Sequence, residues 1–455
     1  MQLPPSSKIP SFIQRLQWVF NPLQLMDISA KTHGDFFSLQ LTNAEPIVFI
    51  SNPQGIQEVF TTPPDYFDAG RSNKLIKPLV GDNSLLLIDG ANHQRQRRLL
   101  TPPFHGERMK AYAQIITNIT QQVISDWQLG QPFSVRDSMQ EISLRVILQA
   151  VFGLSEGERL TKLQKLVTSL LDLSGSPLRS AVTFFPALQL DLGAWSPWGK
   201  FLREREKIHQ ILYTEIQERR DNPDSSRTDI LSLMMSAQDE NGEGMTDIEL
   251  RDELMTLLLA GHETTASALT WALYWIHNLP TVREKLINEL NSIAENTELN
   301  EIYRLPYLTA ICQETLRIYP IAMITLPRIV KTPTKIMGYE FAAGTLLAPC
   351  IYLTHRRPDL YPEPEKFKPE RFLERQYSQY EYLPFGGGNR ICIGMAFAMF
   401  EMKLVLATVL SQLDLELVDN IPVKPMRRGV TLAPSGGKWL VATGKREKVK
   451  IAVGV

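Results

Sequence analysis

Cysteine is scarce in this chain: 455 residues contain 3, and no two of them form a Cys-x-x-Cys pair. So small and odd a number argues against a disulfide framework and against a structural zinc site. Scarce cysteine also fits a reducing compartment, and we expect a cytoplasmic protein.

An excess of positive charge is also missing. The chain has 48 Lys and Arg against 49 Asp and Glu, a net charge of -1, so we expect no nucleic-acid partner. Hydrophobic residues make up 44 %, which is enough for a large globular core. No internal repeat or low-complexity linker divides the sequence, and we predict a single domain over residues 1–455.

No early apolar run approaches the roughly 20 residues that a membrane span requires. Prolines interrupt the first residues, MQLPPSSKIPSF, where a signal peptide needs an apolar stretch. Residues 12–20 mix apolar side chains with Gln and Arg15. We expect this amphipathic piece to pack on the domain, and peripheral contact with a membrane surface is the alternative.

The local patterns predict a fold that is mostly α with a smaller β portion. FFSLQL and PIVFIS, separated by a turn at residues 42–44, predict a β-rich early portion at about 35–60. Residues 109–128 and 138–152 have helical periodicity, and residues 174–177 and 221–226 are expected to be loops. KWLVATG predicts a strand near the C-terminal end.

The longest predicted helix runs over residues 246–280. Thr246 and Glu249 form a capping box at its start, and Pro280 ends it. Its length of about 50 Å is enough to cross a domain.

The centre of this helix is apolar nearly all round, which is also typical of a membrane span. His262, Glu263, Thr264 and Thr265 lie at its midpoint, and such groups are costly in lipid. We therefore expect a buried central helix with a functional site at mid-length.

The strongest functional pattern is FGGGNRICIG, from Phe385 to Gly394. Its glycines permit backbone conformations closed to other residues and a close approach to a flat ligand. Backbone N–H groups and the start of the following helix can stabilise a thiolate at Cys392, which should lower its pKa, and Arg390 can reach a carboxylate. Cys312 and Cys350 carry no such pattern and are expected to be small buried side chains.

This pattern resembles the haem-binding loop of the cytochrome P-450 superfamily, Phe-x-x-Gly-x-Arg-x-Cys-x-Gly, and every fixed position matches. The resemblance implies the cytochrome P-450 fold, a long central helix over the haem, and haem b (iron protoporphyrin IX) as cofactor. It also implies that Cys392 ligates the iron, that Phe385 packs beside the sulfur, and that Arg390 contacts a haem propionate.

Two further motifs of the family are matched. Glu314 and Arg317, with Arg371 of a later Pro-Glu-Arg-Phe, resemble the family's buried ionic cluster, which implies a structural role. His93, Arg97 and Arg328 resemble residues that hold the haem propionates together with Arg390.

The segment from Ala260 to Thr265 resembles the family's oxygen-activation segment. The resemblance implies that Thr264 and Glu263 relay protons to dioxygen. Gly261 is expected to remove side-chain bulk where the helix passes over a ligand. Two alternatives remain: Glu263 is a buried salt-bridge member, or His262 is a second iron ligand.

The resemblance implies a monooxygenase that inserts one atom of dioxygen into a C–H bond. The sequence contains no Gly-x-Gly-x-x-Gly motif that would indicate a fused nucleotide-binding domain. We therefore expect a separate electron donor, a ferredoxin with its reductase. Arg95, Arg98 and Lys403 are candidate contacts for an acidic donor, and solvated surface is the alternative. We expect a monomer.

Position in similar enzymes predicts a lipophilic substrate pocket, because nearly all the candidate residues are apolar. They are Leu86, Leu257, Ala260, Ala322, Met323, Ile324 and Leu432. The chain resembles bacterial or cyanobacterial hydroxylases of long-chain fatty acids or terpenoids. The apolar residues 182–198 are a candidate access lid, and Arg71, Lys74 or Lys77 could anchor a carboxylate or simply form a basic surface loop.

Two rival functions remain at this point. One is a haem-thiolate enzyme independent of dioxygen, such as a peroxygenase or hydroperoxide isomerase, against which Glu263 and Thr264 argue. The other is a non-catalytic haem sensor, which would need a protein ligand on the distal side of the iron.

Overall fold

The structure is a computed structural model that describes residues 4–41, 45–104, 106, 108–154, 157–172, 189–292, 299–435 and 439–446. Most of the described chain is helical, and the strands form four small sheets. The α-helices are α1 (Ser11–Phe20), α2 (Pro22–His33), α3 (Pro53–Thr61), α4 (Lys77–Val80), α5 (Gly90–Leu100), α6 (Arg108–Ser125), α7 (Val135–Phe152), α8 (Glu158–Asp172), α10 (Pro197–Asp221), α11 (Ile230–Ser236), α12 (Asp247–Asn278), α13 (Pro280–Asn291), α14 (Leu299–Ile302), α15 (Pro306–Ile318), α16 (Ile351–Thr354), α17 (Arg371–Glu374) and α18 (Met395–Gln412). The strands are β1 (Phe36–Leu39), β2 (Ile47–Ile50), β3 (Phe67–Asp68), β4 (Pro132–Ser134), β5 (Arg328–Val330), β6 (Thr334–Ile336), β7 (Tyr339–Phe341), β8 (Leu346–Pro349), β9 (Leu413–Leu417), β10 (Pro425–Arg428), β11 (Thr431–Pro434) and β12 (Trp439–Lys445).

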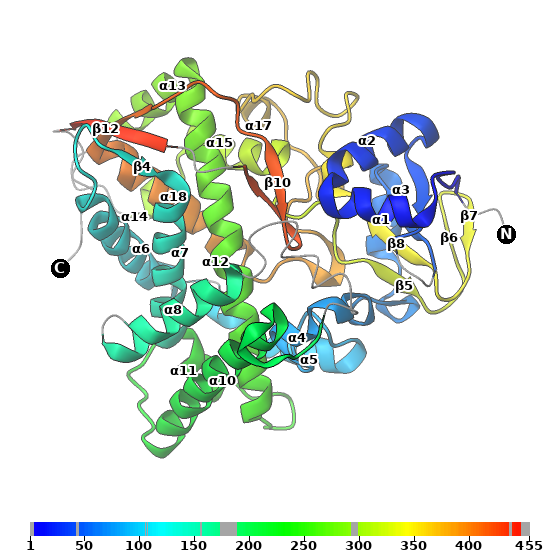
Figure 1. The fold of residues 1–455 in the computed structure, drawn as a ribbon, viewed down its shortest axis with the longest axis horizontal. Coiled ribbons are helices and arrows are strands. Elements are labelled where there is room, and N and C mark those ends of the chain that lie inside the picture. The colour runs from blue at the N-terminus through cyan, green and yellow to red at the C-terminus, as the bar shows by residue number, and fades with distance from the viewer. Residues whose placement is uncertain are drawn as a thin grey trace.

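The main sheet has the order β1-β2-β8-β5-β3, in which only β2 and β8 are parallel. Successive side chains of a strand point to opposite faces. Phe37 and Phe49 therefore pack with α2 in one core cluster, while Phe36 and Val48 belong to another. Both faces of this sheet are buried, and the sheet lies with α1 to α3 at the right of Figure 1.

A larger helical core fills the other side of the molecule, where α6, α7 and α18 lie (Figure 1). Helix α12 runs through the middle between this core and the sheet, as the apolar central helix was predicted to do. Thr246 caps it in a complete capping box with Glu249, and Pro280 begins the next helix. The helix therefore brings its midpoint to the centre of the fold.

The secondary-structure predictions that fall on described residues hold with one correction. The two early strands and the C-terminal strand are confirmed, but the prediction of a β-rich portion to residue 60 is wrong because residues 53–61 form α3. Asn52 caps that helix and Pro53 begins it, a start signal that we overlooked. The predicted turn at 42–44, the predicted loop at 174–177 and residues 182–188 of the candidate lid lie outside the described residues.

Among the described residues, α18 is the one helix that is long and apolar enough to cross a membrane. In the fold, 72 % of that 18-residue window is buried. Its hydropathy therefore follows from packing against α6, α12 and α15.

Behind these helices, the expected ionic cluster is present and buried. Arg317 donates to both carboxylate oxygens of Glu314, at 2.7 and 2.9 Å, and Arg371 donates to the same carboxylate at 3.2 Å. Glu314 and Arg317 are both fully buried. Arg317 also donates to the carbonyl of His355 at 2.8 Å, so the cluster ties α15 to the chain that follows the main sheet.

We expect Glu314→Ala to lower the free energy of unfolding by about 3–5 kcal/mol, because it leaves buried guanidinium groups without a counter-charge. Urea denaturation of the parent and the variant measures this difference.

The matched control is Asp82→Ala, which breaks the Lys77–Asp82 pair, whose side chains are 55 % and 70 % exposed. That change should cost less than about 1 kcal/mol. Equal losses in the two variants would contradict a stabilising role for the cluster.

Candidate functional site

The loop around Cys392 is closed by its own backbone. The N–H of Cys392 donates to the carbonyl of Phe385 at 2.9 Å. Gly386 and Gly388 have φ of 71° and 63°, in the region that favours glycine. Gly387 is extended, but a Cβ there would lie 2.3 Å from the ring of Phe60. The central glycine thus permits close approach of α3, not of a flat ligand as we expected.

Cys392 is accessible to solvent, but protein atoms surround its thiol. Both are expected of a side chain that faces an interior space. Burial raises the pKa of its thiol and outweighs the N–H of Gly394 and the guanidinium of Arg97, which lower it. The predicted lowering of this pKa is therefore wrong for the protein alone. The predicted N–H contact and the helix start after Gly394 are both present.

Beside the loop, the four predicted anion-binding residues gather. Burial lowers the pKa of His93 to about 3, with further lowering by Arg390, Arg97 and Arg328. Burial, followed by Arg390, lowers the pKa of Arg328 to about 9. With a pKa of about 3, His93 is neutral at pH 7, and the positive charge of the cluster is carried by buried guanidinium groups, of which those of Arg328 and Arg390 repel each other.

Asp89 is the carboxylate of this cluster, and we did not single it out from the sequence. Burial acts to raise its pKa, but the backbone N–H groups of Gly70, Ala69 and Arg71, together with Arg390, outweigh burial and lower it. Arg390 donates to Asp89 at 2.5 Å and to the carbonyls of Leu85 and Ile88. An Asp followed by Gly at a helix start was the available signal.

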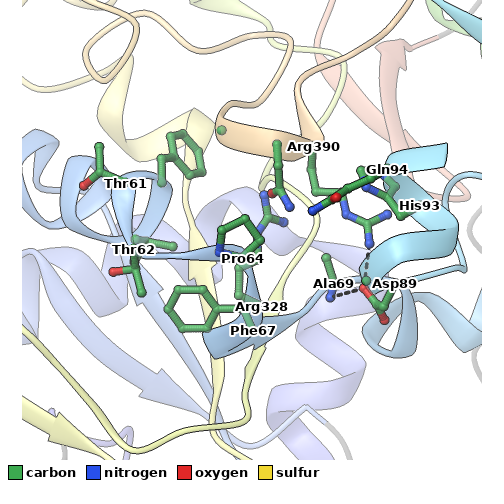
Figure 2. Close-up of a pocket in the computed structure, with 15 residues that line it drawn as sticks. Thr61, Thr62, Pro64, Phe67, Ala69, Asp89, His93, Gln94, Arg328 and Arg390 are labelled. Carbon is green, nitrogen blue, oxygen red and sulfur yellow. Dashed lines mark hydrogen bonds and ion pairs between the residues drawn. The ribbon is translucent and has the colours of Figure 1, made fainter. Parts of the chain in front are cut away.

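A cleft of about 330 Å³ opens at this cluster. Figure 2 shows Arg328 and Arg390 between Thr61, Thr62, Pro64 and Phe67 on one side and Asp89, His93 and Gln94 on the other. The cluster is therefore reached from the surface along the ends of α3 and α5.

At the midpoint of α12, accessible and buried side chains alternate with the helix period. Ala260 is exposed and Thr264 is half-buried, whereas His262 and Thr265 are buried. The Thr264 hydroxyl donates to the carbonyl of Ala260 at 2.5 Å. His262 thus points into the packed interior, away from the accessible face, which disfavours the alternative that it is a second iron ligand.

Glu263 is engaged by two side chains of α7. Arg136 donates to one carboxylate oxygen at 2.5 Å and Gln140 to the other at 2.9 Å. Glu263 is thus a half-buried salt-bridge member, close to one of the alternatives above, and a proton-relay role requires it to leave these partners. Arg136 and Gln140 stand one turn apart in the sequence, a spacing too common to have indicated this role.

Gly261 lies where α7 and α12 cross. A Cβ there would lie 2.9 Å from the Cδ1 atom of Ile147, and the hydroxyl of Ser143 donates to the carbonyl of His262 at 3.2 Å. The prediction that Gly261 makes room for a ligand is therefore wrong: it makes room for α7.

The predicted pocket residues divide into two groups. Leu86, Leu257, Ala322 and Ile324 are half-buried and Ala260 is exposed. Met323 and Leu432 pack into the core cluster with Phe37 and Phe49, so their assignment to an accessible pocket is wrong. Burial alternates along residues 321–326, and a period of two cannot tell which face is accessible.

Each predicted donor contact has a partner within the chain, and Arg98 and its partner lie at the surface. Arg95 binds Asp239 and Glu249, at 2.6 and 3.2 Å, and Arg98 pairs with Glu240. Lys403 is buried and donates to the carbonyl of Tyr303 at 2.9 Å, so its prediction as a surface contact is wrong.

Comparison with known proteins decides the family. The family model described as "Cytochrome P450" matches residues 3–441. The chain belongs to the cytochrome P-450 family. It is thus a haem-thiolate monooxygenase, an oxidoreductase, with the mostly helical fold of that family.

Two relatives of this cytochrome P-450 come from Mycobacterium tuberculosis. One, designated cytochrome P-450 135B1, is 36 % identical over 448 residues, which cover 98 % of this chain and 93 % of the relative. Another, cytochrome P-450 138, is 31 % identical over 447 residues, covering 97 % and 96 %.

Two solved structures share the fold. The retinoic acid-bound cyanobacterial CYP120A1 has a TM-score of 0.84 and 25 % identity, and 97 % of this chain matches 99 % of that one. The haem domain of cytochrome P-450DA has a TM-score of 0.83 and 23 % identity, and 97 % of this chain matches 98 % of it.

The residues present fit a haem. The buried Nε atom of Arg390 has no hydrogen-bond partner within the described part of the chain, and the cation cluster has an excess of positive charge that two propionates would offset. Binding of Cys392 to iron would deprotonate a thiol that burial otherwise keeps neutral.

We expect Gly387→Ala to lower haem retention and the midpoint of thermal unfolding, because the new methyl group would overlap the ring of Phe60. The double variant Gly387→Ala with Phe60→Ala should recover part of the loss, with a coupling of about 1–3 kcal/mol. Calorimetry and the haem-to-protein absorbance ratio measure the two effects.

Gly244→Ala is the control, since a Cβ there makes only an ordinary contact, at 3.5 Å. If removing the ring of Phe60 gives no recovery, steric conflict with α3 is not the cause.

Proposed function

We propose that this cytochrome P-450 inserts one oxygen atom from dioxygen into a C–H bond of a lipophilic substrate, with Cys392 as the iron ligand. The observation that carries the proposal is the accessible thiol of Cys392 in a glycine loop, beside buried cations that lack counter-charge. His93, Arg97, Arg328 and Arg390 would hold the propionates of the haem.

The haem supplies dioxygen activation when it is bound, and the protein has to position the substrate and move protons. Thr264 lies on the accessible face of α12, and its hydroxyl can pass a proton by turning away from the carbonyl of Ala260. Glu263 would exchange its contacts with Arg136 and Gln140 before it delivers a proton.

The substrate class follows from the apolar character of the accessible candidates, Leu86, Leu257, Ala260 and Ile324. A long-chain fatty acid or a terpenoid fits such a surface, and the cyanobacterial relative binds the terpenoid retinoic acid. Arg71 pairs with Asp68 and Lys77 with Asp82, which argues against both as anchors for a substrate carboxylate.

The electrons would come from a separate donor of the ferredoxin type. The cleft at Arg328 and Arg390 is a surface opening next to the haem-binding cations, and Gln94 and Asn389 line it. Gln94 and Asn389, which are both exposed, replace the buried Lys403 as candidate donor contacts. We further propose a monomer in a reducing, cytoplasmic compartment, in keeping with free Cys312, Cys350 and Cys392.

The spectrum of the ferrous carbon-monoxide complex tests the thiolate assignment. Haem-loaded parent protein should give a strongly red-shifted Soret band, and Cys392→Ala should lose it, because only a thiolate ligand donates enough electron density. Cys312→Ala is the matched control and should keep the band. A histidine-type spectrum in the fresh parent would refute the assignment.

The role of Thr264 is tested by coupling. Thr264→Ala should lower the yield of product per dioxygen consumed by about tenfold or more, with the excess appearing as peroxide, because the hydroxyl no longer delivers protons. Thr264→Ser should retain most of the coupling. If donor-driven and peroxide-driven turnover are both unchanged in Thr264→Ala, Thr264 does not relay protons.

A further inference from the structure

Four side chains share one face of α12 because their spacing follows the helix period: Glu253, Leu257, Ala260 and Thr264. Leu257 and Thr264 are half-buried and Ala260 is exposed, although the helix around them is packed inside the fold. We call these three residues the accessible stripe. Glu253, one turn beyond Leu257, is 1 % exposed, so the stripe stops between these two residues.

The segment from Asn83 to Leu85 covers Glu253. The N–H of Leu85 donates to Oε1 of Glu253 at 2.6 Å, and the N–H of Asn83 donates to Asp252 at 2.9 Å. Between them, the hydroxyl of Thr256 donates to that of Ser84 at 2.7 Å. Three successive residues are therefore fixed to three side chains of α12.

The opposite side of the same segment is fixed to the thiolate loop. Arg390 donates to the carbonyl of Leu85 at 2.9 Å and to that of Ile88 at 2.6 Å. Leu85 thus bridges Glu253 and an arginine two positions before Cys392. Leu85 therefore lies between the Glu253 end of α12 and the thiolate loop.

We infer that Glu253 is a specificity-determining residue: by holding Leu85 across the end of the accessible stripe, it limits how long a ligand can lie along α12 from the thiolate. This inference rests on the proposed function, since it assumes that the ligand lies beside Cys392. The helix rises about 16 Å between Thr264 and Glu253, so the limit falls within the length of a fatty-acyl or terpenoid chain.

The state of the Glu253 side chain fits this role. Burial raises the pKa of Glu253 well above its usual range, and the N–H of Leu85 only partly opposes that effect. Burial therefore disfavours a negative charge behind Leu85. Leu85, which covers Glu253, is itself buried and aliphatic.

Alkyl imidazoles of increasing length measure the limit without knowledge of the substrate. The imidazole nitrogen binds the ferric haem of the holoenzyme, and the tail, from methyl to dodecyl, samples the space along α12. In the parent, the spectral dissociation constant should fall roughly fourfold per methylene until the tail meets Leu85, and then level off. In Glu253→Ala the break should move to chains at least two methylenes longer.

Glu253→Gln should keep the break of the parent, because its amide oxygen still accepts from the N–H of Leu85. Thr256→Val, which loses the contact with Ser84, should move the break in the same direction by less, and it serves as the test if Glu253→Ala does not retain haem. Glu249→Ala is the matched control, since Glu249 lies one turn earlier and binds Arg95.

Three results would overturn the inference: a break that stays in place in both Glu253→Ala and Thr256→Val, an equal movement in Glu249→Ala, or no break up to dodecyl in the parent. Failure of the proposed function looks different, because it would remove the red-shifted carbon-monoxide band of the parent itself.

Discussion

The hydrogen bonds from Arg390 to the main chain of Leu85 and Ile88 join an early and a late segment of the chain. One side chain thereby fixes the thiolate loop to the segment that covers α12 and, through Asp89, to the start of α5. The buried guanidinium needs acceptors in fixed positions, so the loop and the segment can only be placed together. The accessible face of α12, the cation cluster and the cleft of Figure 2 all take their positions from this contact.

Charge is distributed unevenly around that contact. In the ionic cluster of Glu314, Arg317 and Arg371, both guanidinium groups pair with the carboxylate of Glu314. In the cluster of His93, Arg97, Arg328 and Arg390, Asp89 pairs with Arg390, and burial lowers the pKa of all four side chains. A protein that buries cations without enough counter-ions gives up stability at that place, and an anionic cofactor restores it on binding.

The sequence predicted those parts of the fold that local chemistry determines. The capping box of Thr246 and Glu249 and the glycines of the thiolate loop have signals within a few residues, whereas the ionic cluster was predicted from the resemblance to the family. What could not be predicted depends on contacts between distant segments. Gly261 faces Ile147, Gly387 faces Phe60, and Lys403 is buried against Tyr303, and no local pattern distinguishes these from ligand or solvent contacts. The same holds for Met323 and Leu432, because an alternation of buried and accessible residues does not tell which of the two faces is accessible.

The contact between Arg390 and Leu85 spans 305 positions of the chain. During synthesis, the segment at Leu85 leaves the ribosome long before Arg390 exists, and loop closure over such a distance is slow. The anion-binding residues near the start of the chain and the thiol near its end can meet only after nearly all of the protein has been made. Capture of the cofactor is therefore a late event in the maturation of this protein, and chains truncated before Cys392 would be apoproteins for quality control to remove.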